Sequence, residues 1–331
     1  MNQLEILRES LGQCDEIILD ALIMRNRIVE DIMAYKEANG LQILQPEQEA
    51  KQKEWLEKRM EGRRHKDEVS DVFECIRTNS KRIQARKLFD YNIVLIGFMG
   101  TGKSTISDFL KNVFAMDVVE MDQIIAQRQG MSISDIFETY GEQYFRDLET
   151  NLLIEMQSRS NVVISCGGGT PMRECNVVEM KKNGRVVLLT AKPETILDRV
   201  KNNHDRPLIE NNKTVPFIAD LMEKRRAKYE AAADIIIETD GKNELEICEE
   251  LVHRLRTMDE EKKYNMTDLV YDIRSAGYQV IILNVSVIIK RYGVSRLTGQ
   301  SHIFLYSDIL LSQISWSYNP IPSVPVRSHI S

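Results

Sequence analysis

A segment near the middle of the chain combines glycines, a lysine and a serine at the spacing of a phosphate-binding loop. The apolar run Asn92–Ile96 is followed at once by Gly-Phe-Met-Gly-Thr-Gly-Lys-Ser, which is the pattern G-x-x-x-x-G-K-S. In such a loop the glycines permit a tight turn, and backbone N–H groups and the start of the next helix face a bound anion. Lys103 is expected to reach the β- and γ-phosphates of ATP, and Ser104 to bind Mg²⁺. The candidate ATP-binding residues of this loop are Gly97, Gly100, Thr101, Gly102, Lys103, Ser104 and Thr105.

Acidic residues and glycines follow two later apolar segments. Glu120 and Asp122 would lie on the same side of an extended chain, and near the phosphates if their strand neighbours the first one. The alternative interpretation is a pair of solvated acids at a strand end. The run Gly167-Gly168-Gly169 predicts a close approach of the backbone to a polar group. These residues are further candidates for the same site.

Two cations interrupt the apolar face of a predicted amino-terminal helix, and a third lies beside that face. Arg25 and Lys36 are separated by about three helical turns, so both point inward from one face. Arg8 lies roughly a quarter-turn off that face, so it would serve a pocket in a second subunit more easily than the pocket of its own chain. Buried cations need an anion. The spacing therefore leaves two interpretations open, a dianionic ligand or salt bridges to Glu30 or Asp31 on the same helix.

The first 89 residues have the periodicity of three helices. Apolar residues recur every three or four positions over residues 4–38, and Asn39-Gly40 would end this helix. At ~1.5 Å per residue the helix is about 50 Å long, more than a compact domain of this size needs, so we expect it to pack against a second copy of itself. A second helix is expected over residues 46–60, beginning with a proline, and a third over about 67–89.

Short apolar segments alternate with helical stretches after residue 91. The predicted strands cover residues 92–96, 117–121, 161–166, 185–189 and 234–238. This alternation predicts a five-stranded parallel sheet with helices on both faces, with ligands at the carboxyl ends of the strands. We therefore expect an all-α domain over residues 1–90, an α/β domain over 91–257, and a tail over 258–331 that is poorly ordered and has no catalytic role.

Composition and charge argue against several classes of protein. The 331 residues carry a formal net charge of -6, from 44 Lys+Arg against 50 Asp+Glu, which argues against general nucleic-acid binding. The five cysteines have no metal-binding spacing, as expected for free thiols in a reducing compartment. The longest apolar run, residues 280–289, is too short to cross a bilayer, and no secretory signal is recognisable. We expect a cytoplasmic protein with no nucleic-acid or membrane partner.

Residues 1–89 resemble the all-helical chorismate mutase family, whose three helices form an intertwined dimer. The residues that carry the resemblance are Leu7-Arg8-Glu9, Asp15, Arg25, Lys36, Pro46, Glu49, Ser80 and Gln84. In that family the arginine matching Arg8 crosses into the site of the other subunit, which agrees with its angular offset. The sequence departs from the family pattern at Gln48, where arginine is frequent, and at Gln45, where aspartate is frequent.

The resemblance implies that a homodimer rearranges chorismate to prephenate. Arg25 and Arg8 from the other subunit would hold the carboxylates, and Lys36 and Gln84, as catalytic residues, would bind the ether oxygen of the breaking bond. Glu49 would bind the ring hydroxyl group, and Ser80 would line the pocket. The implied chorismate-binding residues are Arg8, Arg25, Lys36, Gln48, Glu49, Ser80 and Gln84.

Residues 92 to about 255 closely resemble shikimate kinase, a P-loop enzyme with the fold of the nucleoside monophosphate kinases. The resemblance rests on the phosphate-binding loop and on Glu120-Met121-Asp122, Phe145-Arg146-Asp147-Leu148-Glu149, Gly167-Gly168-Gly169, Arg199, Arg206-Pro207-Leu208, Arg225 and Tyr229. It implies that ATP occupies the loop, with Arg199 against the nucleotide and Arg206 on a lid over the phosphates. The sequence departs at Glu120, where the family usually has an aspartate near Mg²⁺, so Ser104 and Glu120 are the candidate metal ligands.

The same resemblance implies where shikimate binds. Arg146 and Arg225 would hold its carboxylate, and Glu149 would orient Arg146. Asp122 would accept or orient the proton of the 3-hydroxyl group, while Lys103 and Arg206 stabilise charge on the transferring phosphoryl group. The implied shikimate-binding residues are Asp122, Arg146, Gly167, Gly168, Gly169 and Arg225.

The function favoured by both resemblances is a bifunctional enzyme of aromatic amino-acid biosynthesis. One alternative is another small-molecule P-loop kinase, which would explain the phosphate-binding loop but not the paired Arg146 and Arg225. A second alternative is a shikimate kinase whose helical domain only dimerises or binds an effector, and Gln48 is the best support for it.

Overall fold

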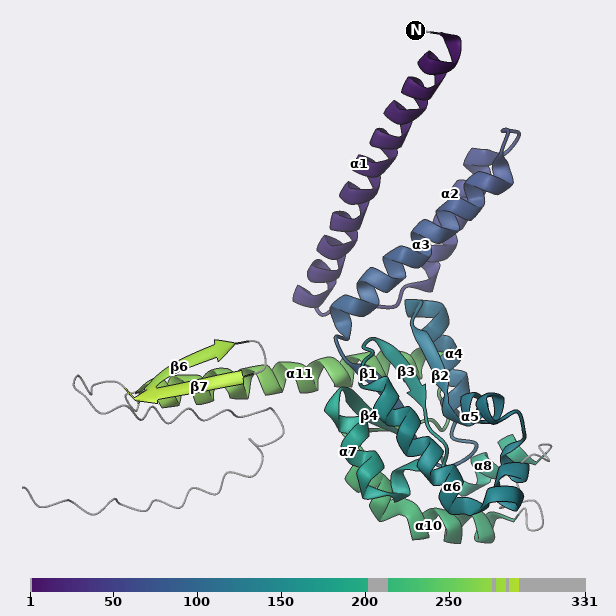
Figure 1. Cartoon of the computed structure of the whole chain (residues 1–331), viewed down its shortest axis with the longest axis vertical. Coiled ribbons are helices and arrows are strands. Elements are labelled where there is room, and N and C mark those ends of the chain that lie inside the picture. Colours follow the sequence, from purple (N-terminus) through teal and green to yellow (C-terminus); the bar gives the residue numbers. More distant parts are fainter. Residues whose placement is uncertain (1, 202–213, 276–277, 284–285, 292–331) are drawn as a thin grey trace, which may run out of the picture. The chain divides into compact units, whose positions relative to one another are not determined.

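The computed structural model describes residues 2–201, 214–275, 278–283 and 286–291 (Figure 1). The chain forms two units, Met1–Met258 and Asp259–Ser331. The first unit contains three amino-terminal helices and an α/β domain. This is the order of fold classes that the hydrophobic periodicity predicted.

Three helices lie at the positions predicted from the periodicity. Helix α1 spans Gln3–Ala38, α2 spans Pro46–Met60 and α3 spans Lys66–Leu88. A capping box between Asn2 and Glu5 starts α1, since each side chain accepts a hydrogen bond from the backbone of the other. Helix α1 packs against α3 near its carboxyl end, where its buried residues lie.

Most of the apolar side chains of α1 are exposed. Val29 and Met33 are buried, but Leu11 is 62% exposed and Ile17 is 69% exposed. Other exposed apolar side chains on this helix are Leu4, Ile6, Leu7, Ile18, Leu19, Ile23, Met24, Ile28 and Ile32. A contiguous apolar surface along a helix of this length usually marks a protein interface.

Five parallel strands form the sheet of the α/β domain. They are β1 (Asn92–Ile96), β2 (Asp117–Glu120), β3 (Val162–Ser165), β4 (Gly184–Thr190) and β5 (Ile235–Glu238), in the spatial order β2-β3-β1-β4-β5. Glu120 was expected near the phosphates if its strand neighboured the first strand. That condition is not met, because β3 lies between β1 and β2. Apolar patterns define strands but do not specify which strands pair, so the sequence left this order open.

The structure describes seven helices of this domain, and the last of them continues into the second unit. They are α4 (Lys103–Phe114), α5 (Met121–Gln129), α6 (Ile133–Met156), α7 (Glu174–Lys182), α8 (Pro193–Val200), α10 (Val215–Ala232) and α11 (Glu244–Ser275). A short 3-10 helix, η1, covers Thr170–Met172. Asp122 lies in the first turn of α5, so the expectation that it continues an extended strand after Glu120 is wrong. Its placement at the carboxyl edge of the sheet is nevertheless retained.

The side chains of β1 alternate between two cores, one on each face of the sheet. Ile93 and Leu95 belong to the first core, and Val94 and Ile96 belong to the second. This explains why β1 is buried throughout its length and apolar from Ile93 onward. The first core also includes residues of the helical part and of α11, namely Met33, Ile43, Leu44, Ala85, Leu88, Leu251 and Leu255. The amino-terminal helices and the α/β domain therefore share one hydrophobic core.

The second unit contains the end of α11 and a hairpin of β6 (Tyr278–Leu283) and β7 (Ser286–Arg291). Residues 292–331 lie outside the described residues, so poor order of the tail stays a prediction. Among the described helices, none has the length and apolar character needed to span a membrane.

Candidate functional site

The loop between β1 and α4 has the backbone of a phosphate-binding loop. Its glycines adopt positive φ angles, 145° at Gly97, 78° at Gly100 and 96° at Gly102. A Cβ atom at Gly97 would lie 2.4 Å from the carbonyl oxygen of Leu189, so β1 can pass β4 here only without a side chain. Gly102 immediately precedes α4, which places Lys103 and Ser104 in the first turn of that helix.

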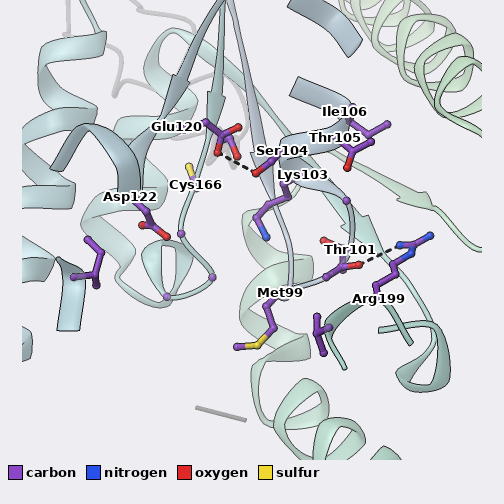
Figure 2. Close-up of a pocket in the computed structure, with 18 of the residues that line it drawn as sticks. Met99, Thr101, Lys103, Ser104, Thr105, Ile106, Glu120, Asp122, Cys166 and Arg199 are labelled. Atoms are coloured by element: carbon purple, nitrogen blue, oxygen red, sulfur yellow. Dashed lines mark hydrogen bonds between the residues drawn. The ribbon is translucent and has the colours of Figure 1, made fainter. Parts of the chain in front are cut away.

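The ammonium group of Lys103 lies over this loop. Its Nζ donates hydrogen bonds to the carbonyl oxygens of Gly97 (2.9 Å) and Phe98 (3.1 Å). Figure 2 shows the group pointing into the space between Asp122 and Thr101. The hydroxyl group of Thr101 donates to the Phe98 carbonyl at 2.8 Å and so braces the turn. A lysine beside the start of a helix is suited to a polyphosphate ligand.

Ser104 and Glu120 provide oxygen atoms beside the loop. The Ser104 hydroxyl group donates to Glu120 Oε2 at 3.2 Å (Figure 2). Ser107 donates to Glu120 Oε1 at 2.5 Å. Although β2 is not adjacent to β1, Glu120 thus reaches the start of α4. Magnesium is held by one or two protein oxygens together with phosphates and water, so this pair fits it. No group of three metal-binding side chains occurs among the residues that the structure describes.

Arg146 faces the loop from α6 and is held by two carboxylates. Its Nη1 donates to Glu149 Oε2 and its Nη2 to Glu142 Oε1, both at 2.8 Å. Glu149 is fully buried and also accepts a hydrogen bond from Thr170. Burial raises the pKa of Glu149, while the hydrogen bonds of Thr170 and Arg146 act against this shift. Burial also opposes the charge of Arg146, but its hydrogen bonds to the two glutamates outweigh burial and raise its pKa.

The three glycines after β3 lie against this arginine and a second one. A Cβ atom at Gly169 would lie 2.4 Å from both terminal nitrogen atoms of Arg146. The carbonyl oxygen of Gly168 accepts hydrogen bonds from Tyr229 Oη (2.6 Å) and Arg225 Nη1 (3.4 Å). Burial raises the pKa of the Tyr229 hydroxyl group, so it stays a hydrogen-bond donor. The glycines therefore bring backbone close to two guanidinium groups.

Both groups of residues line one cavity of about 1140 Å³. Its size suits a nucleotide together with a small second substrate. The predicted site residues that line it are Gly100, Thr101, Gly102, Lys103, Ser104, Thr105, Glu120, Asp122, Arg146, Gly167, Gly168, Gly169, Arg199 and Arg225. Gly97 forms the turn behind it, and Arg206 lies outside the described residues. The arrangement can place an anion at the loop and a carboxylate at the arginines.

Sequence reasoning missed several residues that position the predicted ones. Thr239 accepts a hydrogen bond from Arg199 at 3.1 Å, and Arg199 also donates to the Gly100 carbonyl at 3.1 Å. Thr239 directly follows β5, so its place at the carboxyl edge of the sheet could have identified it. Thr170 binds Glu149, but it carries no pattern of its own and depends on the turn at η1.

The helical part gathers several of its predicted site residues. Arg25 donates a hydrogen bond to Ser80, and Lys36 Nζ donates to the Ile43 carbonyl at 2.9 Å. These bonds go to α3 and to the loop after α1 rather than to Glu30 or Asp31, which favours the ligand interpretation. Gln84 lies one turn after Ser80 and is half-buried.

Two further residues predicted for the chorismate site lie on α2, and a third lies near the amino-terminal end of α1. Glu49 is exposed and forms an ion pair with Lys81 at 2.8 Å, a partner that sequence reasoning missed. Gln48 is exposed. Arg8 is exposed, and at ~1.5 Å per residue it lies about 25 Å along the helix axis from Arg25. The structure therefore does not bring Arg8 to the other residues within one chain.

Two family models match separate parts of the chain. Residues 99–256 match the model described as shikimate kinase, and residues 7–85 match the model described as chorismate mutase type II. These ranges fall on the α/β domain and on the three amino-terminal helices.

Several curated proteins are similar to the α/β domain over nearly their whole length. A shikimate kinase of Persephonella marina is 41% identical over 165 residues, which is 50% of this chain and 99% of the relative. A shikimate kinase of Geobacter sulfurreducens is also 41% identical over 165 residues, covering 50% of this chain and 91% of the relative. A solved shikimate kinase from Acinetobacter baumannii, in complex with shikimate, is 31% identical, with a TM-score of 0.46 over 52% of this chain and 94% of that chain.

Proposed function

Because the chain belongs to the shikimate kinase family and carries a chorismate mutase type II domain before the kinase, we propose how its two sites work. The α/β domain transfers a phosphoryl group from ATP to the 3-hydroxyl group of shikimate. The helical domain rearranges chorismate to prephenate. Both reactions belong to aromatic amino-acid biosynthesis.

The observation that carries the kinase assignment is the pair of arginines opposite the phosphate-binding loop. Arg146 and Arg225 line the same cavity as Lys103, and Gly167–169 admit a ligand close to the backbone. A small substrate with a carboxylate would be held there with a hydroxyl group directed at the nucleotide. A kinase on this fold that phosphorylates another small molecule would explain the phosphate-binding loop but not the pair Arg146 and Arg225.

Phosphoryl transfer needs positioning and charge stabilisation rather than covalent chemistry from the protein. Lys103 and the N–H groups at the start of α4 stabilise the β- and γ-phosphates. Asp122, at the start of α5, orients the shikimate hydroxyl group and accepts its proton. Arg199, held by Thr239, lies against the nucleotide, and Arg206 completes the charge stabilisation from the segment that lies outside the described residues.

Ser104 and Glu120 are the residues that would hold Mg²⁺. Their oxygen atoms lie within hydrogen-bond distance of each other beside the phosphate position. A bound magnesium ion would neutralise phosphate charge there. The longer side chain of Glu120 replaces the shorter aspartate of the family, and Ser107 holds its second oxygen.

The mutase reaction needs a folded conformer of chorismate and positive charge at its ether oxygen. Arg25, oriented by Ser80, binds a carboxylate, and Lys36 and Gln84 donate hydrogen bonds to the ether oxygen. Glu49 binds the ring hydroxyl group. Gln48 is exposed and stands where the family often has an arginine, so the second carboxylate has one positive charge fewer to bind. This departure supports the alternative of a helical domain without catalysis.

We further propose a homodimer through the amino-terminal helices. The exposed apolar side chains of α1 would be covered by a second copy, and Arg8 would enter the site of that copy. The free thiols of buried Cys166 and Cys248 fit a reducing compartment, and we place the enzyme in the cytoplasm.

Two assays of the purified protein test this function. ADP release from ATP should require shikimate, and phosphate should appear on its 3-hydroxyl group. Chorismate alone should disappear with formation of prephenate. Kinase activity without mutase activity would support the non-catalytic helical domain, and ADP release with other acceptors but not shikimate would overturn the kinase assignment.

A further inference from the structure

The loop that holds Lys36 is itself held by the kinase domain. Lys36 donates a hydrogen bond to the carbonyl oxygen of Ile43, in the loop between α1 and α2. The next residue, Leu44, donates its backbone N–H to Glu249 Oε1 of α11 at 2.9 Å. Lys36, Ile43 and Leu44 are all buried. A chain of two hydrogen bonds therefore connects a mutase catalytic lysine to a carboxylate of the other domain.

A second contact connects the domains beside Ser80 and Glu49. Lys81 Nζ donates to the carbonyl oxygen of Asn112, near the end of α4, at 2.9 Å. The same ammonium group pairs with Glu49 at 2.8 Å, and Lys81 directly follows Ser80. Helix α4 begins at the phosphate-binding loop, so its far end supports a residue of the mutase site. The kinase domain thus contacts the helical domain at two points beside its site.

We propose that Glu249 of the kinase domain is a positioning residue of the mutase site, which fixes the 41–45 loop and through it the ammonium group of Lys36. The inference rests on the proposed mutase function of the helical domain. Glu249 does not reach chorismate, and its effect passes through Leu44 and Ile43. The mutase of this chain is therefore built on the kinase domain rather than joined to it by an independent linker.

The carboxylate of Glu249 acts on both the Leu44 backbone and the charge of Lys36. The Leu44 N–H group is buried, and leaving it without an acceptor would favour movement of the loop. Burial lowers the pKa of Lys36, and the negative charge of Glu249 partly opposes this shift. One side chain thus fixes the position of the lysine and favours its charged form.

Substitutions at Glu249 in the full-length protein test the proposal. Glu249→Ala removes the acceptor, so mutase kcat should fall on the order of ten- to a hundredfold, as expected for a misplaced catalytic group. The KM for chorismate should change little, because Arg25, which would hold the carboxylate, is oriented by Ser80 of α3 and not by the 41–45 loop. Glu249→Gln keeps an acceptor oxygen for Leu44 and should restore most of kcat near neutral pH. Glu249→Gln also removes the negative charge that raises the pKa of Lys36. As the pH is raised, the mutase activity of this variant should therefore begin to decline at a lower pH than that of the unmodified protein.

Controls separate this inference from folding and from the proposed function. His253→Ala changes an exposed residue one turn further along α11 and should leave mutase kcat unchanged. Shikimate kinase activity of each preparation reports whether the shared core is folded. Unchanged mutase kinetics in folded Glu249→Ala would overturn the positioning role. If the unmodified protein had no mutase activity, the proposed function of the helical domain would fail instead.

Discussion

At the scale of single residues, the kinase site depends on how two arginines are held. Arg146 is fixed between a fully buried glutamate, Glu149, and the exposed Glu142, whereas Arg225 lies beside Gly168 and over the ring of Phe98, 5.9 Å from its centre. Their guanidinium groups are therefore in place before a carboxylate arrives. Such preorganisation reduces the entropy that substrate binding must overcome.

Replacement of either arginine should chiefly weaken shikimate binding. In Arg146→Ala or Arg225→Ala the carboxylate loses a charge-assisted hydrogen bond of ~1.5–3 kcal/mol, so KM for shikimate should rise roughly ten- to a hundredfold. KM for ATP should change much less. Steady-state kinetics with each substrate varied in turn measure both values. The control is Arg128→Ala, which removes a surface ion pair with Glu155; collapse of ATP binding with normal use of shikimate would refute the assignment.

The protonation of Lys36 should be visible in the pH dependence of the mutase. Burial lowers its pKa, so Lys36 is charged below that pKa and loses its proton at a lower pH than an ordinary lysine. In the proposed mechanism the charged form donates to the ether oxygen, so mutase kcat/KM should fall as the pH rises through this lowered pKa. Lys36→Arg, which stays charged, should show a lower but flat rate over the same range. A decline that persists in Lys36→Arg would assign the titration to another group.

At the scale of elements, the sequence predicted local structure better than arrangement. The positions of α1, α2, α3 and β1 followed from apolar periodicity and from Pro46 at the start of α2. Most of the residues predicted for the kinase site lie around one cavity, because the carboxyl ends of parallel strands meet at one edge. The strand order was left open, and β2 does not neighbour β1 as the placement of Glu120 had supposed, since pairing depends on the whole sheet. Contacts such as Glu249 with Leu44 join residues too distant in sequence for any local pattern.

Replacement of two glycines of the kinase site by alanine should have different effects, one on stability and one on shikimate binding. At Gly97 the added Cβ atom meets the backbone of β4, which cannot move, and φ is 145°, so Gly97→Ala should lower the melting temperature. At Gly169 the three atoms nearest the Cβ atom all belong to the guanidinium end of Arg146, a flexible side chain that can move aside. Gly169→Ala should therefore stay folded but show a raised KM for shikimate.

Calorimetry and kinetics on both variants test this contrast. Gly12→Ala serves as the control, because no atom lies within 4 Å of the added methyl group and alanine favours a helix. A Gly169→Ala protein with normal shikimate binding would mean that Arg146 does not need its observed position.

At the scale of the whole molecule, the proposed mutase site would be completed only by a second chain. Arg8 lies about 25 Å along α1 from Arg25, and most of the apolar side chains between them are exposed. A twofold dimer would cover these side chains and give each site an Arg8 from the other subunit. The kinase cavity, by contrast, is lined by residues of a single chain.

Mixed dimers should reveal this exchange. Arg8→Ala and Arg25→Ala should each be nearly inactive as mutases, but reassembly of a mixture should restore roughly a quarter of the activity. Half of the random dimers are mixed, and one of the two sites in each mixed dimer has both arginines. Mass spectrometry establishes that mixed dimers form. If they form without recovery of activity, Arg8 and Arg25 act within one chain or the domain is not a mutase.

The central claim is that one chain carries two enzymes with separate catalytic residues, although their domains share a core. The direct measurement is the rate of both reactions in a single preparation of folded Lys103→Ala protein. We predict that phosphorylation of shikimate is abolished, because the β- and γ-phosphates lose their ammonium partner. Rearrangement of chorismate should stay near the rate of the unmodified protein, because Lys103 lies outside the contacts that support Lys36 and Glu49. Equal loss of both activities would contradict the account.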